Sequence, residues 1–174
     1  EGRLHAALVK SDSMLASVQG AFNAISVYGN FVGHTMSYGA GAGSHPTASA
    51  VVGDIIDIAR RSEAEGVKQI PPLAVPLEAL EQKRILPIDE IESSYYLCCE
   101  LNDLEGQQSI LERIEQQGIK VLKSATLPPH QHRDSSLLAA LTDTVQERDI
   151  QMLVKDLNIL FCKGQATKLI RVDS

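Results

Sequence analysis

Three glycines lie at alternating positions in the segment YGAGAGSHPTASAVV, which runs from residue 38 to residue 52. They are Gly39, Gly41 and Gly43, and a proline and an aliphatic run follow them. Glycine permits sharp turns and lets other groups come close to the backbone. A helix that begins here presents unbonded N–H groups, and these attract electron-rich ligand atoms. The segment therefore predicts either a tight turn from strand to helix or one wall of a binding pocket.

Two histidines in the loop PPHQHRDS have the spacing of a pair of metal ligands. His130 and His132 form an HxH pair, which in an extended segment can share one metal ion. No third ligand is evident in the sequence, so we favour a solvated loop and predict no metal site. His45 lies inside the glycine-rich segment, where a capping or surface role is favoured over contact with a ligand.

The bulk composition is that of a globular protein and argues against several classes of partner. The 174 residues carry a formal net charge of −6, and 44% of them are hydrophobic. An acidic chain without a basic run is a poor candidate for binding nucleic acid or an anionic membrane. No apolar stretch approaches the length of a membrane span, and the N-terminus does not resemble a signal peptide. The three cysteines form no CxxC motif and are typical of reduced thiols, so we expect a cytoplasmic protein.

The elements that would position the glycines are three strands and a helix. Sequence patterns predict strands at 5–9, 22–27 and 31–38, the last two antiparallel about a tight turn at 28–30. Ser44 is the predicted N-cap of the helix, and Arg60 and Arg61 suit its C-terminal end. The apolar positions that recur at helical spacing are Ala48, Val51, Val52, Ile55, Ile58 and Ala59.

A proline-rich connector divides the chain into two parts. Residues 62–90 hold four of the seven prolines and lack clean periodicity. Proline opposes regular helix and strand, so we predict one short helix here, near 77–83. The predicted organisation is a first domain at 1–64, a linker at 65–90 and a second domain at 91–174.

The second domain alternates strands and helices in a clear order. Strands are predicted at 94–101, 119–127, 136–143 and 167–172, with a helix between the first two and another between the last two. Gly118 suits the end of the first helix, and Thr144 with Glu147 suggests a capping box at the start of the second. Cys98 and Cys99 are adjacent on a strand, so their side chains point to opposite faces and are not expected to bond each other. The order βαββαβ is the ferredoxin-like arrangement, and the fold class of the whole chain is α+β.

Both parts of the chain resemble homoserine dehydrogenase. LASVQGAFNAISV (15–27) and YGAGAGSHPTASAVVGDIIDIAR (38–60) resemble its late catalytic region, whose pattern is LA-V-G-x-x-NA followed by YG-x-GAG-x-x-PTA-SAVV-D. SSYYLCCELNDLEG (93–106) resembles the opening of the ACT domain that many bacterial members carry at their C-terminus, and IRVDS resembles its ending. The resemblance covers nearly the whole chain and implies a partial catalytic α/β domain, of antiparallel strands plus a helix, followed by an ACT domain.

The resemblance implies an enzyme that interconverts L-homoserine and L-aspartate 4-semialdehyde with NADP or NAD, on the route to threonine, isoleucine and methionine. It implies contact with the nicotinamide cofactor at Gly41, Ala42, Gly43 and Thr47. The family's Rossmann domain and catalytic lysine have no counterpart here, since no strand–GxGxxG–helix unit occurs. We therefore expect the C-terminal portion of a longer enzyme, inactive alone, and assign no catalytic residue.

The ACT resemblance implies an effector site at Asn102, Asp103 and Gly106, in the turn after the first strand. The family usually has Asp-x-Pro-Gly there, whereas Glu105 replaces the proline, adds negative charge and loosens the turn. Two interpretations stay open: the domain binds a regulatory amino acid such as threonine, or it only pairs subunits into a homo-oligomer. The alternative for the whole chain is a non-catalytic amino-acid-binding or dimerisation module.

Overall fold

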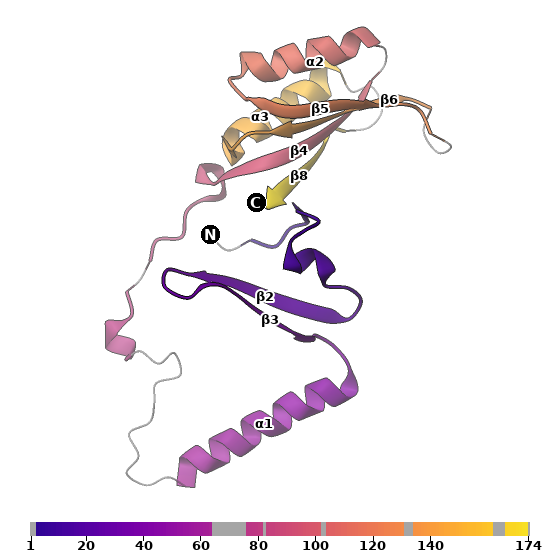
Figure 1. Ribbon diagram of the computed structural model, residues 1–174. Coiled ribbons are helices and arrows are strands. Elements are labelled where there is room, and N and C mark those ends of the chain that lie inside the picture. Colours follow the sequence, from indigo (N-terminus) through magenta and orange to yellow (C-terminus); the bar gives the residue numbers. More distant parts are fainter. Residues whose placement is uncertain are drawn as a thin grey trace. The chain divides into compact units, whose positions relative to one another are not determined.

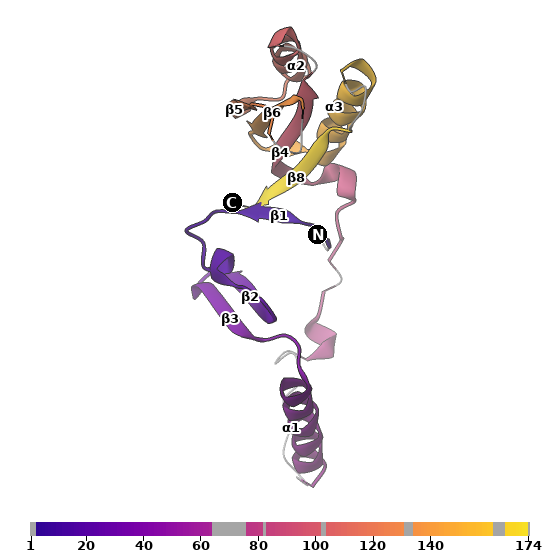
Figure 2. The same cartoon turned by 90° about the vertical axis from the view of Figure 1, so that its right-hand side faces the viewer.

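The protein divides into two compact units, one of residues 1–10 and 84–174 and the other of residues 11–83. The computed structural model describes residues 3–63, 76–81, 83–101, 104–130, 134–161 and 166–173. Figures 1 and 2 show the helices and strands of both units. The chain as a whole is α+β, in agreement with the predicted class.

The larger unit is built on a mixed sheet with the strand order β1-β8-β4-β6-β5, and β7 pairs with β4. Neighbouring strands are antiparallel except β1, which runs parallel to β8. The strands are β1 (Ala7–Val9), β4 (Glu92–Leu101), β5 (Val121–Leu127), β6 (Ser136–Thr142), β7 (Val145–Gln146) and β8 (Lys168–Asp173). The helical elements are α2 (Leu104–Gln116), α3 (Glu147–Leu160) and the short 3₁₀ helix η3 (Ile88–Glu90).

The core of the larger unit lies between the two long helices and one face of the sheet. Every second residue of β4 from Ser93 to Leu101 is buried, which is the period of a strand with one covered face. These side chains meet Ile110 and Ile114 from α2, and Ile150, Leu153 and Leu157 from α3. Both helices therefore cover the same face of the sheet (Figure 2).

The described part of the smaller unit holds a hairpin, one long helix and two short 3₁₀ turns. The hairpin strands are β2 (Phe22–Gly29) and β3 (Gly33–Ala40), and the helix is α1 (Ser44–Glu63). The 3₁₀ turns are η1 (Met14–Ser17) and η2 (Leu77–Ala79). Among the described residues of this unit, none is buried.

Most predicted elements are confirmed to within a few residues, and the differences have local causes. The hairpin turn spans 30–32 rather than 28–30, because strand pairing continues until Gly29 faces Gly33. Gly33 has a φ of +73°, which suits the end of a three-residue hairpin loop. The helix predicted near 77–83 is the short turn η2, while residues 64–75 lie outside the described part. The domain limits 1–64, 65–90 and 91–174 stay a prediction.

The two predicted N-terminal helix caps are wrong. At α1 the carbonyl of Gly43 accepts the N–H of Thr47 at 3.1 Å, so Gly43 rather than Ser44 occupies the N-cap position. Helix α3 begins at Glu147 after an N-cap at Gln146 that makes no side-chain hydrogen bond, so no capping box with Thr144 forms. The carboxylate of Glu147 is instead engaged in a buried network, described below.

The adjacent cysteines lie as their strand position predicts. Cys99 is buried and Cys98 is half-buried, and neither forms a disulfide, while Cys162 lies outside the described residues. None of the described helices combines the length and the apolar character that crossing a membrane requires.

Candidate functional site

The glycine-rich segment connects β3 to α1, and two of its glycines have a local structural reason. The N–H of Gly41 donates to the carbonyl oxygen of Ala21 at 3.0 Å, which ties the end of β3 to the start of β2. A Cβ atom on Gly41 would overlap the side-chain amide of Asn23. Only glycine fits under this side chain without a shift of the amide.

Gly43 is required for a different reason. Its φ of +124° lies in a region that residues with a side chain rarely adopt. A substitution here is strained even though the nearest atom to a new Cβ, Cδ of Pro46, would be 3.3 Å away. Gly43 thus sets the direction in which α1 leaves the turn.

The N-terminus of α1 is open and electropositive. No acidic residue lies in its first turn, and every residue from Tyr38 to Ala50 is exposed. Within the described part of the chain, the N–H groups of Ala42, Gly43 and Ser44 make no hydrogen bond. Together with the helix dipole, these groups can hold an electron-rich atom of a ligand.

The four predicted cofactor residues lie within this turn and the first turn of α1. They are Gly41, Ala42, Gly43 and Thr47. The N–H groups of Gly41 and Thr47 already donate to the carbonyl oxygens of Ala21 and Gly43. The available donors are therefore the N–H groups of Ala42 and Gly43. This arrangement fits an electron-rich group of a nicotinamide cofactor at the helix N-terminus, although contact with a cofactor stays a prediction.

The predicted effector site and the histidine pair at 130 and 132 are described only in part. Asn102 and Asp103 lie outside the described residues, whereas Gly106 is half-buried in the first turns of α2. His132 also lies outside them. Among the residues that are described, no three His, Cys, Asp or Glu side chains gather in a way that could hold a metal ion.

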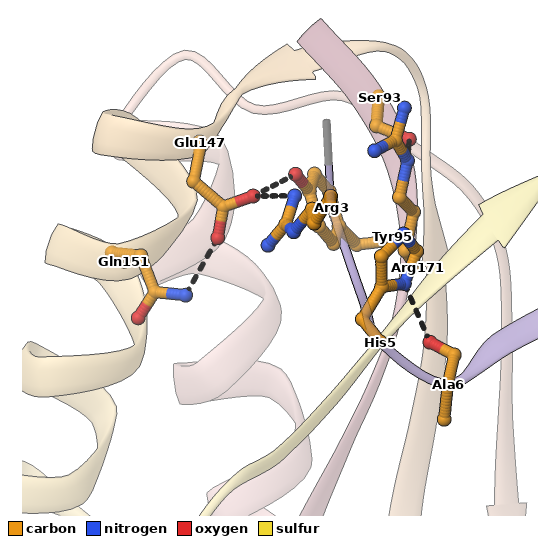
Figure 3. A network of polar contacts seen from close by, with 8 residues as sticks. All are labelled: Arg3, His5, Ala6, Ser93, Tyr95, Glu147, Gln151 and Arg171. Atoms are coloured by element: carbon orange, nitrogen blue, oxygen red, sulfur yellow. Dashed lines mark hydrogen bonds and ion pairs between the residues drawn. The ribbon is translucent and has the colours of Figure 1, made fainter. Parts of the chain in front are cut away.

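A buried polar network in the larger unit was not predicted from the sequence (Figure 3). The side chain of Glu147 is 3% exposed, at the first residue of α3. Its Oε2 accepts hydrogen bonds from the hydroxyl of Tyr95 at 2.5 Å and from the guanidinium of Arg3 at 2.8 Å. Its Oε1 accepts from the amide of Gln151 at 2.8 Å. Three segments of the chain therefore converge on one carboxylate.

The charges in this network are mutually stabilised. Burial would raise the pKa of Glu147, but the hydrogen bonds from Arg3, Tyr95 and Gln151 and the charge of Arg3 hold that pKa below its usual value. Burial, followed by the hydrogen bond and the charge of Glu147, raises the pKa of Tyr95 to about 12. Glu147 thus stays ionised and Tyr95 stays protonated near neutral pH, which suits a structural role better than proton transfer.

An open cavity of about 360 Å³ lies beside this network. Arg171, on β8, donates from Nε to Ser93 Oγ at 2.8 Å, and its side chain lines the cavity. The lining residues are Arg3, Leu4, His5, Ala7, Arg171 and Asp173. No sequence signal joins the two ends of the chain here, because Arg3 and Glu147 are 144 positions apart.

Comparison with known proteins relates the chain to one group of enzymes. Residues 1–56 match the family model described as homoserine dehydrogenase. A homoserine dehydrogenase from Neisseria gonorrhoeae is 36% identical over 174 residues, which is all of this chain and 40% of the relative. One from Helicobacter pylori is 34% identical over 174 residues, again all of this chain, and 39% of the relative.

A solved structure of a homoserine dehydrogenase is also similar to this chain. The crystal structure of a homoserine dehydrogenase from Thiobacillus denitrificans matches 97% of this chain and 38% of its own, with a TM-score of 0.81 and 28% identity. The chain thus spans about two fifths of the length of these relatives.

Proposed function

Because this chain is related to homoserine dehydrogenases and corresponds to a C-terminal portion of them, we propose that the complete protein is an NAD(P)-dependent homoserine dehydrogenase. It would interconvert L-homoserine and L-aspartate 4-semialdehyde, on the route to threonine, methionine and isoleucine. The observation that carries the proposal is the family match over residues 1–56, since this range includes the glycine turn and the start of α1.

In this enzyme the turn at Gly41, Ala42, Gly43 and Thr47 contacts the nicotinamide cofactor, which supplies the hydride chemistry. The support is the open N-terminus of α1, with N–H groups at Ala42 and Gly43 that no described residue occupies. The part of this chain is to position the cofactor. A Rossmann domain outside this chain would bind the rest of it.

The exposed surface of the smaller unit supports the presence of further polypeptide. Phe31, Tyr28, Val32 and Ile25 of the hairpin region are 106%, 80%, 70% and 68% exposed. The apolar residues of α1 that the sequence places on one face are exposed as well. Large exposed apolar surfaces mark contacts with other protein, so we expect the remainder of the catalytic domain to cover β2, β3 and α1.

A substitution at Gly43 tests the cofactor proposal in the complete enzyme. Gly43→Val strains the turn and places a side chain at the helix N-terminus, so we expect the Kd for NADPH or NADH to rise by roughly tenfold or more. Gly53→Ala is the matched control, because Gly53 lies on α1 with nothing near its Cβ position. Unchanged cofactor affinity in a Gly43→Val enzyme with normal thermal stability would contradict the assignment.

For residues 91–174 we propose an ACT domain. Its support is the element order β4-α2-β5-β6-α3-β8 and the strand order β8-β4-β6-β5, with both helices on one face. The turn at Asn102, Asp103 and Gly106 would bind a regulatory amino acid such as threonine, or the domain would serve only to pair subunits into a homo-oligomer.

The second candidate for the chain is a non-catalytic amino-acid-binding or dimerisation module. It is favoured by the fact that, among the described residues, the buried core lies in the larger unit. An assay of homoserine oxidation by the protein encoded by the complete coding sequence separates the candidates. Activity supports the enzyme, and its absence in a folded protein supports the module. The 174-residue chain alone should be inactive in either case.

A further inference from the structure

We propose that the side-chain amide of Asn23 binds the carboxamide of the nicotinamide ring, and that the side-chain-free backbone at Gly39 and Gly41, the glycine strip, receives the ring beside it. The inference rests on the proposed cofactor role of the glycine-rich segment and adds a residue of β2 to that role. Asn23 and the glycine strip lie at the end of the hairpin from which the chain enters α1 (Figure 1).

Gly39 differs from Gly41 and Gly43, because nothing in the described part of the chain requires a glycine there. It lies inside β3, and its φ is not positive. A Cβ atom at Gly39 would meet no described atom within 4 Å. Glycine inside a strand weakens the strand and often marks a place where a ligand or another backbone comes close. The open side of Gly39 therefore suits a group that the described residues do not supply.

Asn23 stands on the same face of the hairpin as this open side. It is paired with Gly39 across the two strands, and residues paired in this way point to one face. The side chain leans along the hairpin toward Gly41, where it occupies the space that a Cβ atom would need. Within the described part of the chain, this exposed amide makes no hydrogen bond. An NH₂ donor and a carbonyl acceptor are thus available beside the glycine strip.

The chemistry of the amide selects the nicotinamide end of the cofactor. Two carboxamides complement each other through two hydrogen bonds, since each has one NH₂ group and one carbonyl oxygen. A phosphate only accepts hydrogen bonds, so it would suit the N–H groups of Ala42 and Gly43 but leave the carbonyl oxygen of Asn23 without a donor. A planar ring can lie close to backbone that carries no side chain. Ile25, on the same face as Asn23 and 68% exposed, offers such a ring apolar contact.

Calorimetric titration of the complete protein tests the contact, with NADP and NAD and with the 3-acetylpyridine analogue of each as probes. The analogue has a methyl group in place of the carboxamide NH₂, so it can form only one of the two bonds to Asn23. We expect Asn23→Ala to raise the Kd for the natural cofactor by roughly tenfold or more, and the Kd for the analogue by clearly less. The preference of the wild type for the natural cofactor should therefore shrink in Asn23→Ala. This change of preference isolates the contact from other effects of the substitution.

Two further variants separate contact from packing. Asn23→Asp keeps the shape of the side chain and one acceptor for the NH₂ group, so it should weaken both ligands but retain the preference. Asn30→Ala, in the loop at the far end of the hairpin, is the matched control and should bind both ligands as the wild type does. If Asn23→Ala weakens both ligands equally, or neither, the contact with the carboxamide is wrong.

Gly39→Val tests the glycine strip. Because a Cβ atom there meets no described atom, we expect the Kd for the natural cofactor to rise roughly tenfold or more at an unchanged unfolding temperature. Unchanged affinity, or affinity that falls together with the unfolding temperature, would mean that polypeptide covers Gly39 and would overturn the inference. If Gly43→Val weakens cofactor binding while the Asn23 and Gly39 variants do not, the proposed cofactor role stands and only this inference fails.

Discussion

The fold closely constrains the position and the charge of the Glu147 side chain. Its carboxylate is almost fully buried and receives hydrogen bonds from Tyr95, Arg3 and Gln151. A buried carboxylate is tolerated only when its hydrogen bonds and its charge are satisfied. We therefore expect the ionised form to stabilise the folded larger unit.

Replacing Glu147 by Gln tests this expectation. Because the folded-state pKa lies below the ordinary value of 4.5, the stabilisation is complete above that pH and is lost as the pH falls through the folded pKa. Near neutral pH, Glu147→Gln should lower the free energy of unfolding by roughly 2 kcal/mol, the size of hydrogen bonds to a charged group. Urea unfolding at several pH values should show the difference from the wild type shrinking below pH 4.5.

Glu115→Gln is the control for that series, because Glu115 is exposed on α2. It should change the free energy of unfolding little at any pH. A difference between Glu147→Gln and the wild type that stays constant down to acid pH would show that the charge of Glu147 does not contribute.

Among the elements, α3 contributes most plainly to the core through Ile150, Leu153 and Leu157, all fully buried. Leu153→Ala should therefore destabilise the larger unit by about 2–5 kcal/mol, since it leaves a cavity as well as losing buried apolar area. The neighbouring Met152 is 52% exposed, so Met152→Ala should cost far less. Equal effects of the two substitutions on urea unfolding would mean that α3 packs with a different face.

Elements whose pattern is local could be predicted from the sequence. The alternation of β4 and the helical spacing in α3 each follow from which residues need burial. The N-caps of α1 and α3 could not be predicted from the sequence. Gly43 and Gln146 occupy them because of the local backbone geometry, and Glu147 bonds residues that are distant in the sequence instead of capping α3. The pairing of β1 with β8 and the contact of Arg3 with Glu147 join residues far apart in sequence, for which a single chain carries no local signal.

The candidate site was predictable to a similar degree. The glycines pointed to the turn before α1, and their positive φ or lack of room confirms why glycine stands at Gly43 and Gly41. The sequence did not show that the N–H of Gly41 donates to Ala21 and is therefore not available to a ligand. This bond depends on how the hairpin closes. The cavity beside β1 had no sequence signal at all.

At the scale of the whole molecule, the two units should differ sharply in local stability. The larger unit has a core of fully buried side chains, and the described residues of the smaller unit include no buried one. Backbone amides without buried neighbours open at little cost. Hydrogen exchange of the 174-residue chain should therefore be roughly a hundredfold or more slower in β4, β6 and α3 than in β2 and β3.

In the complete protein that we propose, the hairpin should become protected, because further polypeptide would cover it. Peptides from α3 serve as the internal reference in both samples. Equal protection of β2 and α3 in the 174-residue chain would show that the hairpin is stable without any covering protein.

The position of β1 has a practical consequence for dissecting the protein. The larger unit is discontinuous, since its first ten residues precede the smaller unit and the rest begins at residue 84. A truncation at residue 84 would look like a clean excision of a C-terminal domain. It would nevertheless remove β1, one of the two strands that pair with β8, and leave the negative charge of Glu147 without Arg3, so the excised piece would be less stable than its core suggests.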